Sequence, residues 1–263
     1  IANAEFVVTR LRAPATESTT ASTPGEGAPS GWRLLRSYKD GQAKFNAYLE
    51  DYACYADGLL ALYEATFDVR WYTAAQGLAE TMVAQFADAA GGGFFDTSAD
   101  HERLLTRPKD LYDNATPAGN SVAADVLLRL DAYSGESRSA PAEALLHGLA
   151  GAMAQHPTAF GRLLGALDFT LGPTKEIAII GEPDAPETQA LLDVVFQRYL
   201  PNRVVALASP GAAGATAVDR IPLLADRPQQ DGRATAYVCE HFTCQLPATE
   251  PEALARQLER SAS

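Results

Sequence analysis

Two aspartates stand where a carboxylate could take part in acid–base chemistry. Asp51 follows Glu50 at the start of a predicted helix, and Asp113 precedes Asn114 in a polar loop. In a glycoside hydrolase, one such carboxyl group protonates the leaving oxygen and the other acts as base or nucleophile. A carboxylate at a helix N-terminus is also stabilised by the helix dipole alone. The residues leave both interpretations of Asp51 open.

A loop rich in charged and amide side chains surrounds Asp113 and leads into a helix. Arg107 and Lys109 could bind anionic substrate groups, and the turn Gly119-Asn120-Ser121 could present donors at the helix start. The alternative is capping, in which Asn120 or Thr116 accepts hydrogen bonds from the first turn. We expect this loop to form the rim of a ligand site. The residues predicted to bind substrate are Tyr52, Arg107, Lys109, Asn114 and Asn120.

Cys239 and Cys244 enclose four residues, which is not the spacing of a CxxC redox motif. Together with His241 they are too few for a zinc site, so no metal is predicted. A reversible disulfide remains an alternative to the favoured interpretation, two unbonded cysteines packed in a short β element. In that favoured case both thiols should react with an alkylating reagent. The chain has three cysteines in all, and such a small, odd number fits a protein of the reducing cytoplasm.

Composition excludes several classes of partner. The net charge is −12 and no basic run occurs, which argues against nucleic acid. No apolar run approaches the ~18 residues of a membrane span, and the start lacks the pattern of a signal peptide. The glycine-rich segments 91–93 and 211–214 lack the order of a phosphate loop, and no cofactor is predicted. A sugar epimerase would be expected to use histidines as general acid and base. The four histidines of this chain occur singly, which argues against that mechanism.

The first 172 residues are dominated by helical patterns. Residues 1–12 predict the end of a truncated helix, and 13–31, rich in Ala, Thr, Ser, Pro and Gly, a flexible loop. From 32 to 172 we expect antiparallel helical hairpins, introduced by a short β hairpin that turns at Asp40-Gly41. Apolar stripes with helical spacing run from Leu49 to Tyr63 and from Trp71 to Phe86. Further helices are expected at about 118–133, at 141–155, and after Thr158 as a cap.

Residues 173–263 have a different character and are predicted as the C-terminal part of the same domain. A β-branched strand at 176–180, a helix at 186–199 and a strand at 204–207 predict two parallel neighbours. A short strand at 234–238 leads to the Cys239/Cys244 segment, and a last helix is expected at 251–260. The fold class is therefore mainly α, with a small α/β element near the C-terminus.

Three stretches in combination carry a family resemblance that covers the chain from Leu34 onward. They are YLEDYACYADGLLALYEATFD at 48–68, DNATPAGNSVAADVLLRL at 113–130 and YVCEHFTCQLP at 237–247. In this order they resemble the C-terminal portion of thioredoxin-domain-containing proteins of the YyaL type, which include spermatogenesis-associated thioredoxin-like proteins. The resemblance implies an N-terminal thioredoxin-like domain, absent from this chain, followed by an (α/α)6 toroid similar to six-hairpin glycosidases and N-acylglucosamine 2-epimerases.

The resemblance implies that this chain is a partial (α/α)6 toroid, and it suggests two functions. The first is a pocket for a carbohydrate-type small molecule, with Asp51 and Asp113 as the catalytic carboxylates. The second is a non-catalytic scaffold or partner-binding module of a redox-linked protein, with a degenerate enzyme as a variant of it. An open polar cavity would favour the first function, and polar side chains consumed by internal bonds would favour the second.

Overall fold

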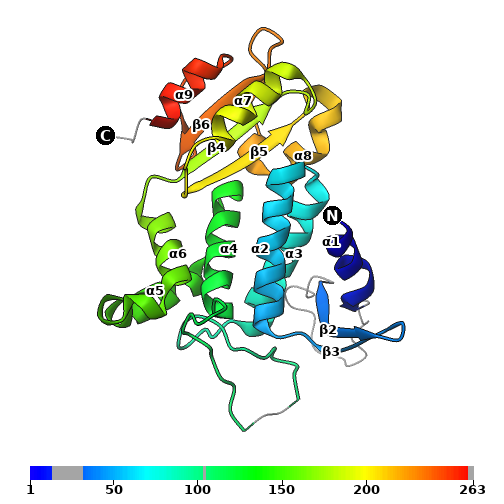
Figure 1. Cartoon of the computed structure of the whole chain (residues 1–263), viewed down its shortest axis with the longest axis vertical. Coiled ribbons are helices and arrows are strands. Elements are labelled where there is room, and N and C mark those ends of the chain that lie inside the picture. Colours follow the sequence, from blue (N-terminus) through cyan, green and yellow to red (C-terminus); the bar gives the residue numbers. More distant parts are fainter. Residues whose placement is uncertain (14–31, 103–104, 260–263) are drawn as a thin grey trace, which may run out of the picture. The chain divides into compact units, whose positions relative to one another are not determined.

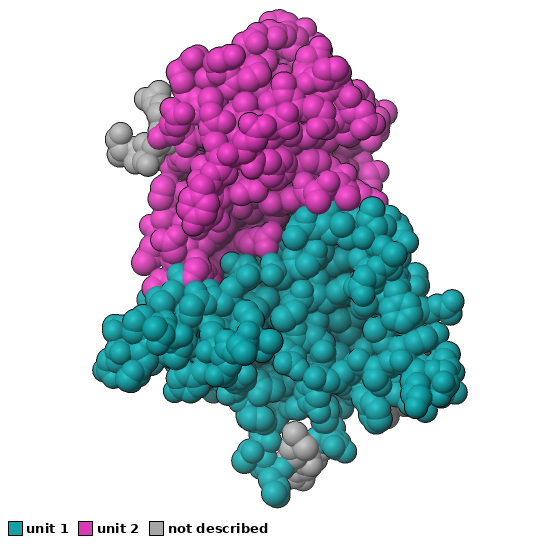
Figure 2. All heavy atoms as spheres, viewed as in Figure 1, with its two compact units in different colours: residues 1–63, 70–127, 139–164 teal, residues 64–69, 128–138, 165–263 magenta. Residues whose placement is uncertain are grey.

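The computed structural model describes residues 1–13, 32–102 and 105–259. Helices dominate these residues (Figure 1), which confirms the prediction of a mainly α chain. The predicted loop 13–31 lies outside the described residues except for Ala13. The chain divides into two compact units, coloured separately in Figure 2. Unit 1 comprises 1–63, 70–127 and 139–164, and unit 2 comprises 64–69, 128–138 and 165–263.

Unit 1 begins with a short helix and a β hairpin. Helix α1 (Ala2–Phe6) continues as a π-helical turn (Val7–Leu11), and β1 (Arg12–Ala13) then pairs antiparallel with β2 (Arg33–Lys39). Strand β3 (Gln42–Asn46) pairs with the other edge of β2. Asp40 and Gly41 both have positive φ, 52° and 77°, as a two-residue hairpin loop requires. The predicted hairpin is confirmed.

The hairpin leads into two long helices of unit 1, α2 (Leu49–Thr66) and α3 (Val69–Phe86). Tyr52, near the start of α2, packs against Phe86 at the end of α3, with ring centroids 5.2 Å apart. Tyr63, near the end of α2, packs against Tyr72 near the start of α3, at 5.7 Å. These contacts make the helices antiparallel, as the short connection between the two apolar stripes predicted.

A glycine turn and a long loop separate this pair from the next helices. Gly92 and Gly93 have φ of 71° and 65°, and Ala87 and Phe94 form an antiparallel bridge around the turn. Helix α4 (Gly119–Ser134) then starts after the loop, followed by α5 (Ala140–Gln155) and α6 (Gly161–Leu171). Thr158 is not the cap of α6, because it lies in a separate 3-10 turn, Pro157–Ala159.

Unit 2 contains a four-stranded sheet in the order β5-β4-β6-β7. Strands β4 (Lys175–Ile180) and β5 (Arg203–Ala208) are parallel, as predicted, and helix α7 (Pro186–Phe196) connects them. Strands β6 (Thr235–Glu240) and β7 (Thr243–Cys244) extend the sheet in antiparallel fashion. Between β5 and β6 lie a 3-10 turn (Gly211–Gly214), α8 (Ala215–Arg220) and a second 3-10 turn (Pro222–Leu224).

Two helices cover one face of this sheet. The last helix, α9 (Pro251–Glu259), and α7 share an apolar core with alternate residues of the strands. Since the side chains of a strand alternate between faces, Ile177 and Ile179 of β4 point to the same side. Buried members of this core include Ile177, Ile179, Leu191, Val195, Val205, Val238 and Leu254.

Candidate functional site

Asp51 lies in the first turn of α2, and its carboxylate is bonded to the backbone before it. Its Oδ2 accepts the amide N–H of Tyr48 at 2.9 Å, the carboxylate half of a capping box. The same oxygen accepts Arg36 Nη1 at 3.0 Å. Burial raises the pKa of Asp51, while the Tyr48 amide and the Arg36 charge oppose that rise. The carboxylate therefore both closes the helix start and holds β2 against it.

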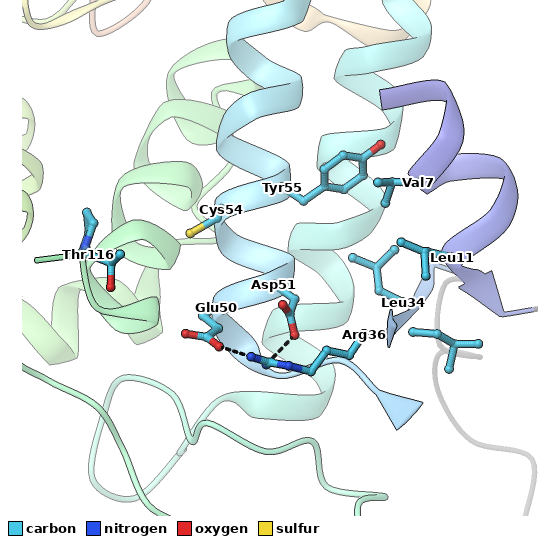
Figure 3. A pocket seen from close by; sticks show the side chains of 11 residues that line it. Val7, Leu11, Leu34, Arg36, Glu50, Asp51, Cys54, Tyr55 and Thr116 are labelled. Atoms are coloured by element: carbon cyan, nitrogen blue, oxygen red, sulfur yellow. Dashed lines mark hydrogen bonds and ion pairs between the residues drawn. The ribbon is translucent and has the colours of Figure 1, made fainter. Parts of the chain in front are cut away.

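A cavity of about 460 Å³ opens beside this carboxylate in unit 1 (Figure 3). Arg36 points between Glu50 and Asp51, and its Nη2 lies 2.8 Å from Glu50 Oε1. The rest of the wall is mainly apolar, and it includes Val7, Leu11, Leu34 and the thiol side chain of Cys54. Asp113 is not among the residues that line this cavity. No local pattern in the sequence indicated Arg36, which reaches α2 from the preceding hairpin.

Tyr52 is a core residue rather than part of the cavity wall. It is 1% exposed, and its hydroxyl accepts the backbone N–H of Leu34 at 2.8 Å. Burial raises the pKa of the phenol. Tyr52 therefore fixes the hairpin to α2. It lies in the core, whereas the sequence predicted it as a substrate contact.

Asp113 joins the starts of two helices. Its Oδ1 accepts the N–H of Ala118, just before α4, at 2.9 Å. Its Oδ2 accepts the N–H groups of Arg162 and Leu163, in the first turn of α6, at 2.8 and 3.3 Å. These amides belong to the donors that a helix leaves without intrahelical partners. Asp113, not Thr158, therefore caps α6.

Arg107 is anchored to backbone on either side of the glycine turn. Its Nη2 donates to the carbonyl oxygens of Thr97 at 2.5 Å and Gln85 at 3.3 Å. Its guanidinium lies 4.2 Å from the centroid of the Phe95 ring. These bonds use part of the donor set that a bound anion would require.

Lys109 is held in the same way. Its Nζ lies 2.6 Å from Asp88 Oδ2 and donates to the carbonyl of Gly92 at 2.6 Å. The hydrogen bond from Lys109, followed by those from the amides of Gly91 and Ala90, lowers the pKa of Asp88 to about 2. Lys109 therefore closes the glycine turn onto the loop.

Asn120 is buried, and both ends of its amide are bonded to backbone. Its Oδ1 accepts the N–H of Phe94 at 2.7 Å, while its Nδ2 donates to the carbonyls of Phe94 and Asp110 at 2.9 and 3.0 Å. Asn114, by contrast, is exposed. Within the described residues, its side chain shows one hydrogen bond, from Nδ2 to the carbonyl of Tyr112 at 3.3 Å. Asn120 thus takes part in loop structure, and Asn114 is left at the surface.

Arg162 forms a second charged cluster that the sequence did not reveal. Its Nη2 lies 2.6 Å from Asp125 Oδ2 in α4 and 3.1 Å from Asp57 Oδ2 in α2. The two carboxylates are far from each other and from Arg162 in the sequence, so no local pattern identifies them. The cluster ties α2, α4 and α6 together within unit 1.

Cys239 and Cys244 form a disulfide in unit 2. The favoured expectation of two unbonded thiols is therefore corrected. The disulfide that the sequence left open as an alternative is present, and its reversibility stays a prediction. The physical reason is register, because β6 and β7 place the two residues directly opposite each other. A spacing of five residues does not by itself predict this pairing.

Within residues 1–13, 32–102 and 105–259, no helix is both long and apolar enough to cross a lipid bilayer. In the same ranges, no three His, Cys, Asp or Glu side chains are grouped so that they could hold a metal ion.

Known proteins resemble this chain over most of its length. No family model matches it. Spermatogenesis-associated protein 20 of Homo sapiens is 36% identical over 213 residues, which is 80% of this chain and 27% of the human protein. The proteins of that name from Mus musculus and Rattus norvegicus are each 35% identical over 215 residues, again 27% of their length. The chain spans about a quarter of these curated relatives and belongs to the spermatogenesis-associated protein 20 family.

Proposed function

We propose that this part of the family is a non-catalytic scaffold or partner-binding module. The observation that carries the proposal is the bonding of Asp113, whose two carboxylate oxygens accept three backbone N–H groups. A general acid must direct an oxygen at the substrate, and a nucleophile must leave one free to attack. Neither requirement suits a carboxylate that caps two helices.

The other polar residues of the loop support the same proposal. Arg107 bonds to backbone carbonyls, Lys109 to Asp88 and a carbonyl, and Asn120 to Phe94 and Asp110. Removing such partners would leave the loop without its anchors, since buried polar groups need hydrogen bonds. Their bonding favours a structural role over binding of substrate.

The proposal extends to the whole protein. In it, residues 32–172 and 173–263 form part of an (α/α)6 toroid that follows an N-terminal thioredoxin-like domain. The toroid would present a partner to that domain rather than perform a reaction itself. The family resemblance supports this arrangement, and the antiparallel packing of α2 on α3 is compatible with it.

The cavity of unit 1 supports a second candidate function, binding of a carbohydrate-type molecule. It is open, largely apolar, and has Arg36, Glu50 and Asp51 converging at one side. Small-molecule sites combine apolar walls with a few polar groups of this kind. Because Arg36 is hydrogen-bonded to both carboxylates, this geometry favours binding without cleavage.

The experiment uses the full-length protein with a panel of aryl glycosides, measuring hydrolysis and the midpoint of thermal unfolding together. The variants are Asp113→Asn and, as the matched control, Asn114→Ala at the exposed neighbour. If the chain is a scaffold, we expect no hydrolysis by the wild type or by either variant, and a lower unfolding temperature for Asp113→Asn alone. Hydrolysis that Asp113→Asn abolishes at an unchanged unfolding temperature would establish a catalytic role and end the proposal.

A further inference from the structure

The disulfide of unit 2 has one protected and one accessible sulfur. Cys239 of β6 is 0% exposed, whereas Cys244 of β7 is exposed. The two residues form a cross-strand pair with Cα atoms 3.9 Å apart, and they enclose the four-residue tip 240–243. An external thiolate can therefore reach Cys244 Sγ, while access to Cys239 is blocked by the sheet.

A guanidinium contacts both sulfurs. Arg227 Nη2 lies 3.2 Å from Cys244 Sγ and 3.4 Å from Cys239 Sγ, and its Nη1 donates to the carbonyl of Ala225 at 2.9 Å. A neutral disulfide sulfur is a weak acceptor, whereas a thiolate beside an arginine is strongly favoured. Arg227 therefore stabilises a cysteine thiolate more than it stabilises the closed disulfide.

We propose that Cys239–Cys244 is a thiol–disulfide exchange site for a dithiol reductant, with Arg227 stabilising the thiolate that leaves. One thiolate of the reductant attacks Cys244 Sγ and forms a mixed disulfide, and the S–S bond to Cys239 breaks. The electron pair of that bond goes to Cys239 Sγ, next to Arg227. The second thiol of the reductant, as its thiolate, then attacks the mixed disulfide and releases Cys244 as a thiolate.

The overall exchange is balanced. The dithiol loses two electrons and two protons and becomes a disulfide, and Cys239 and Cys244 gain them as two thiols. A leaving thiolate of low basicity speeds such a step, so the position of Arg227 has a kinetic consequence. The exposed sulfur selects the point of attack, and the arginine favours cleavage toward the buried one.

The tip between the cysteines gives the exchange a structural consequence. His241 and Phe242 have φ of 49° and 59°, a left-handed conformation that bulky residues rarely adopt. Several contacts hold the tip, among them the N–H of Phe242 donating to Glu176 Oε2 at 2.7 Å, the ion pair of Glu240 with Lys175, and the Phe242 ring resting on Gly135. Reduction removes the covalent link across its base, so we expect the Phe242 amide to exchange its hydrogen faster in the reduced chain.

The test measures the rate at which dithiothreitol reduces the disulfide of the full chain, read by mass tagging of the new thiols. Arg227→Gln removes the charge, and Arg233→Gln is the matched control, since that exposed arginine pairs with Glu250. We expect Arg227→Gln to be reduced roughly three- to tenfold more slowly, with Arg233→Gln at the wild-type rate. Equal rates for all three chains would overturn the proposal, as would two freely alkylated thiols in protein kept under air.

A second variant covers the case in which Arg227→Gln does not fold. Arg227→Lys keeps the positive charge but loses the planar fork, whose Nη1 bonds the Ala225 carbonyl while Nη2 contacts the sulfurs, so its single ammonium group lacks this anchor. We expect the reduction rate of Arg227→Lys to fall between those of the wild type and Arg227→Gln. If Arg227→Gln does not fold, the expected rate of Arg227→Lys is simply below that of the wild type. A rate at or above the wild-type value for Arg227→Lys alone would then contradict the role of the guanidinium.

Discussion

The carboxylate of Asp88 shows how one residue joins the glycine turn to the loop that follows. It receives the Lys109 ammonium and the amides of Ala90 and Gly91, and these donors together lower its pKa to about 2. An aspartate in an unfolded chain has a pKa of roughly 3.9. The folded state therefore prefers the charged carboxylate.

The sign of the resulting pH dependence follows from that depressed pKa. The stabilisation is fully present above the unfolded pKa of about 4 and is lost as the pH falls toward about 2. We expect Asp88→Asn to lower the urea midpoint at pH 7 and the gap to the wild type to shrink below about pH 4. Asp219→Asn, at an exposed residue, is the control and should leave the urea midpoint at pH 7 unchanged. A gap that stays constant from pH 7 to pH 2.5 would contradict the assigned pKa.

Other residues that suggested chemistry from the sequence serve the backbone in the same way. Asp51 bonds to the amide of Tyr48, and Asn120 bonds to the backbone of Phe94 and Asp110. From the sequence, stabilisation by the helix dipole was the alternative for Asp51 and capping was the alternative for Asn120. The partners of Asn120, however, lie in a loop before the helix and not in its first turn. Long-range partners of this kind leave no mark in local spacing.

At the scale of elements, strand β5 is the edge of the unit 2 sheet, and side chains cover its backbone. Glu64 Oε1 accepts the N–H of Val205 at 3.2 Å, and the hydroxyl of Tyr133 donates to the carbonyl of Val205 at 3.2 Å. The same hydroxyl lies 2.7 Å from Glu64 Oε1, so its single proton is shared between these two acceptors. Unpaired edge strands invite pairing with other chains, so these bonds protect β5 as well as stabilise it.

Removing the hydroxyl should measure this protection. Tyr133 is 0% exposed, and we expect Tyr133→Phe to lower the free energy of unfolding by about 1–2 kcal/mol, because the Val205 carbonyl and Glu64 lose a buried donor. Tyr199→Phe is the control, since that side chain is 91% exposed and should leave stability unchanged. Urea unfolding of both variants provides the comparison, and equal stabilities would show that the edge does not depend on Tyr133.

Periodicity predicted the elements better than it predicted their ends. The apolar stripes predicted α2 and α3, and the β-branched segments predicted the parallel pair β4 and β5. Both predictions succeed because burial of one helix face, or of a whole strand, determines the order of apolar residues along the chain. The start of α6 was misplaced. Its cap is Asp113, 49 residues before Arg162, whereas a sequence window sees only the neighbouring Thr158.

At the scale of the whole molecule, the family could be predicted from three stretches of sequence, but the chemistry could not. The relatives match over 80–81% of this chain, yet it spans 27% of their length. Side-chain partners decide whether a carboxylate is free to react, and these partners come from helices that are separate in the sequence. The Cys239–Cys244 bond likewise depends on strand register and not on spacing.

Polar residues whose types suggested catalysis hold the helix starts together instead, and amide hydrogen exchange at Ala118 and Arg162 is the sharpest test of this role. In Asp113→Ala both amides lose their acceptor, so we predict exchange about tenfold faster or more at the starts of α4 and α6 together, with Asn114→Ala at the wild-type rate. Unchanged protection at both amides in Asp113→Ala would contradict the claim and return Asp113 to the candidates for chemistry.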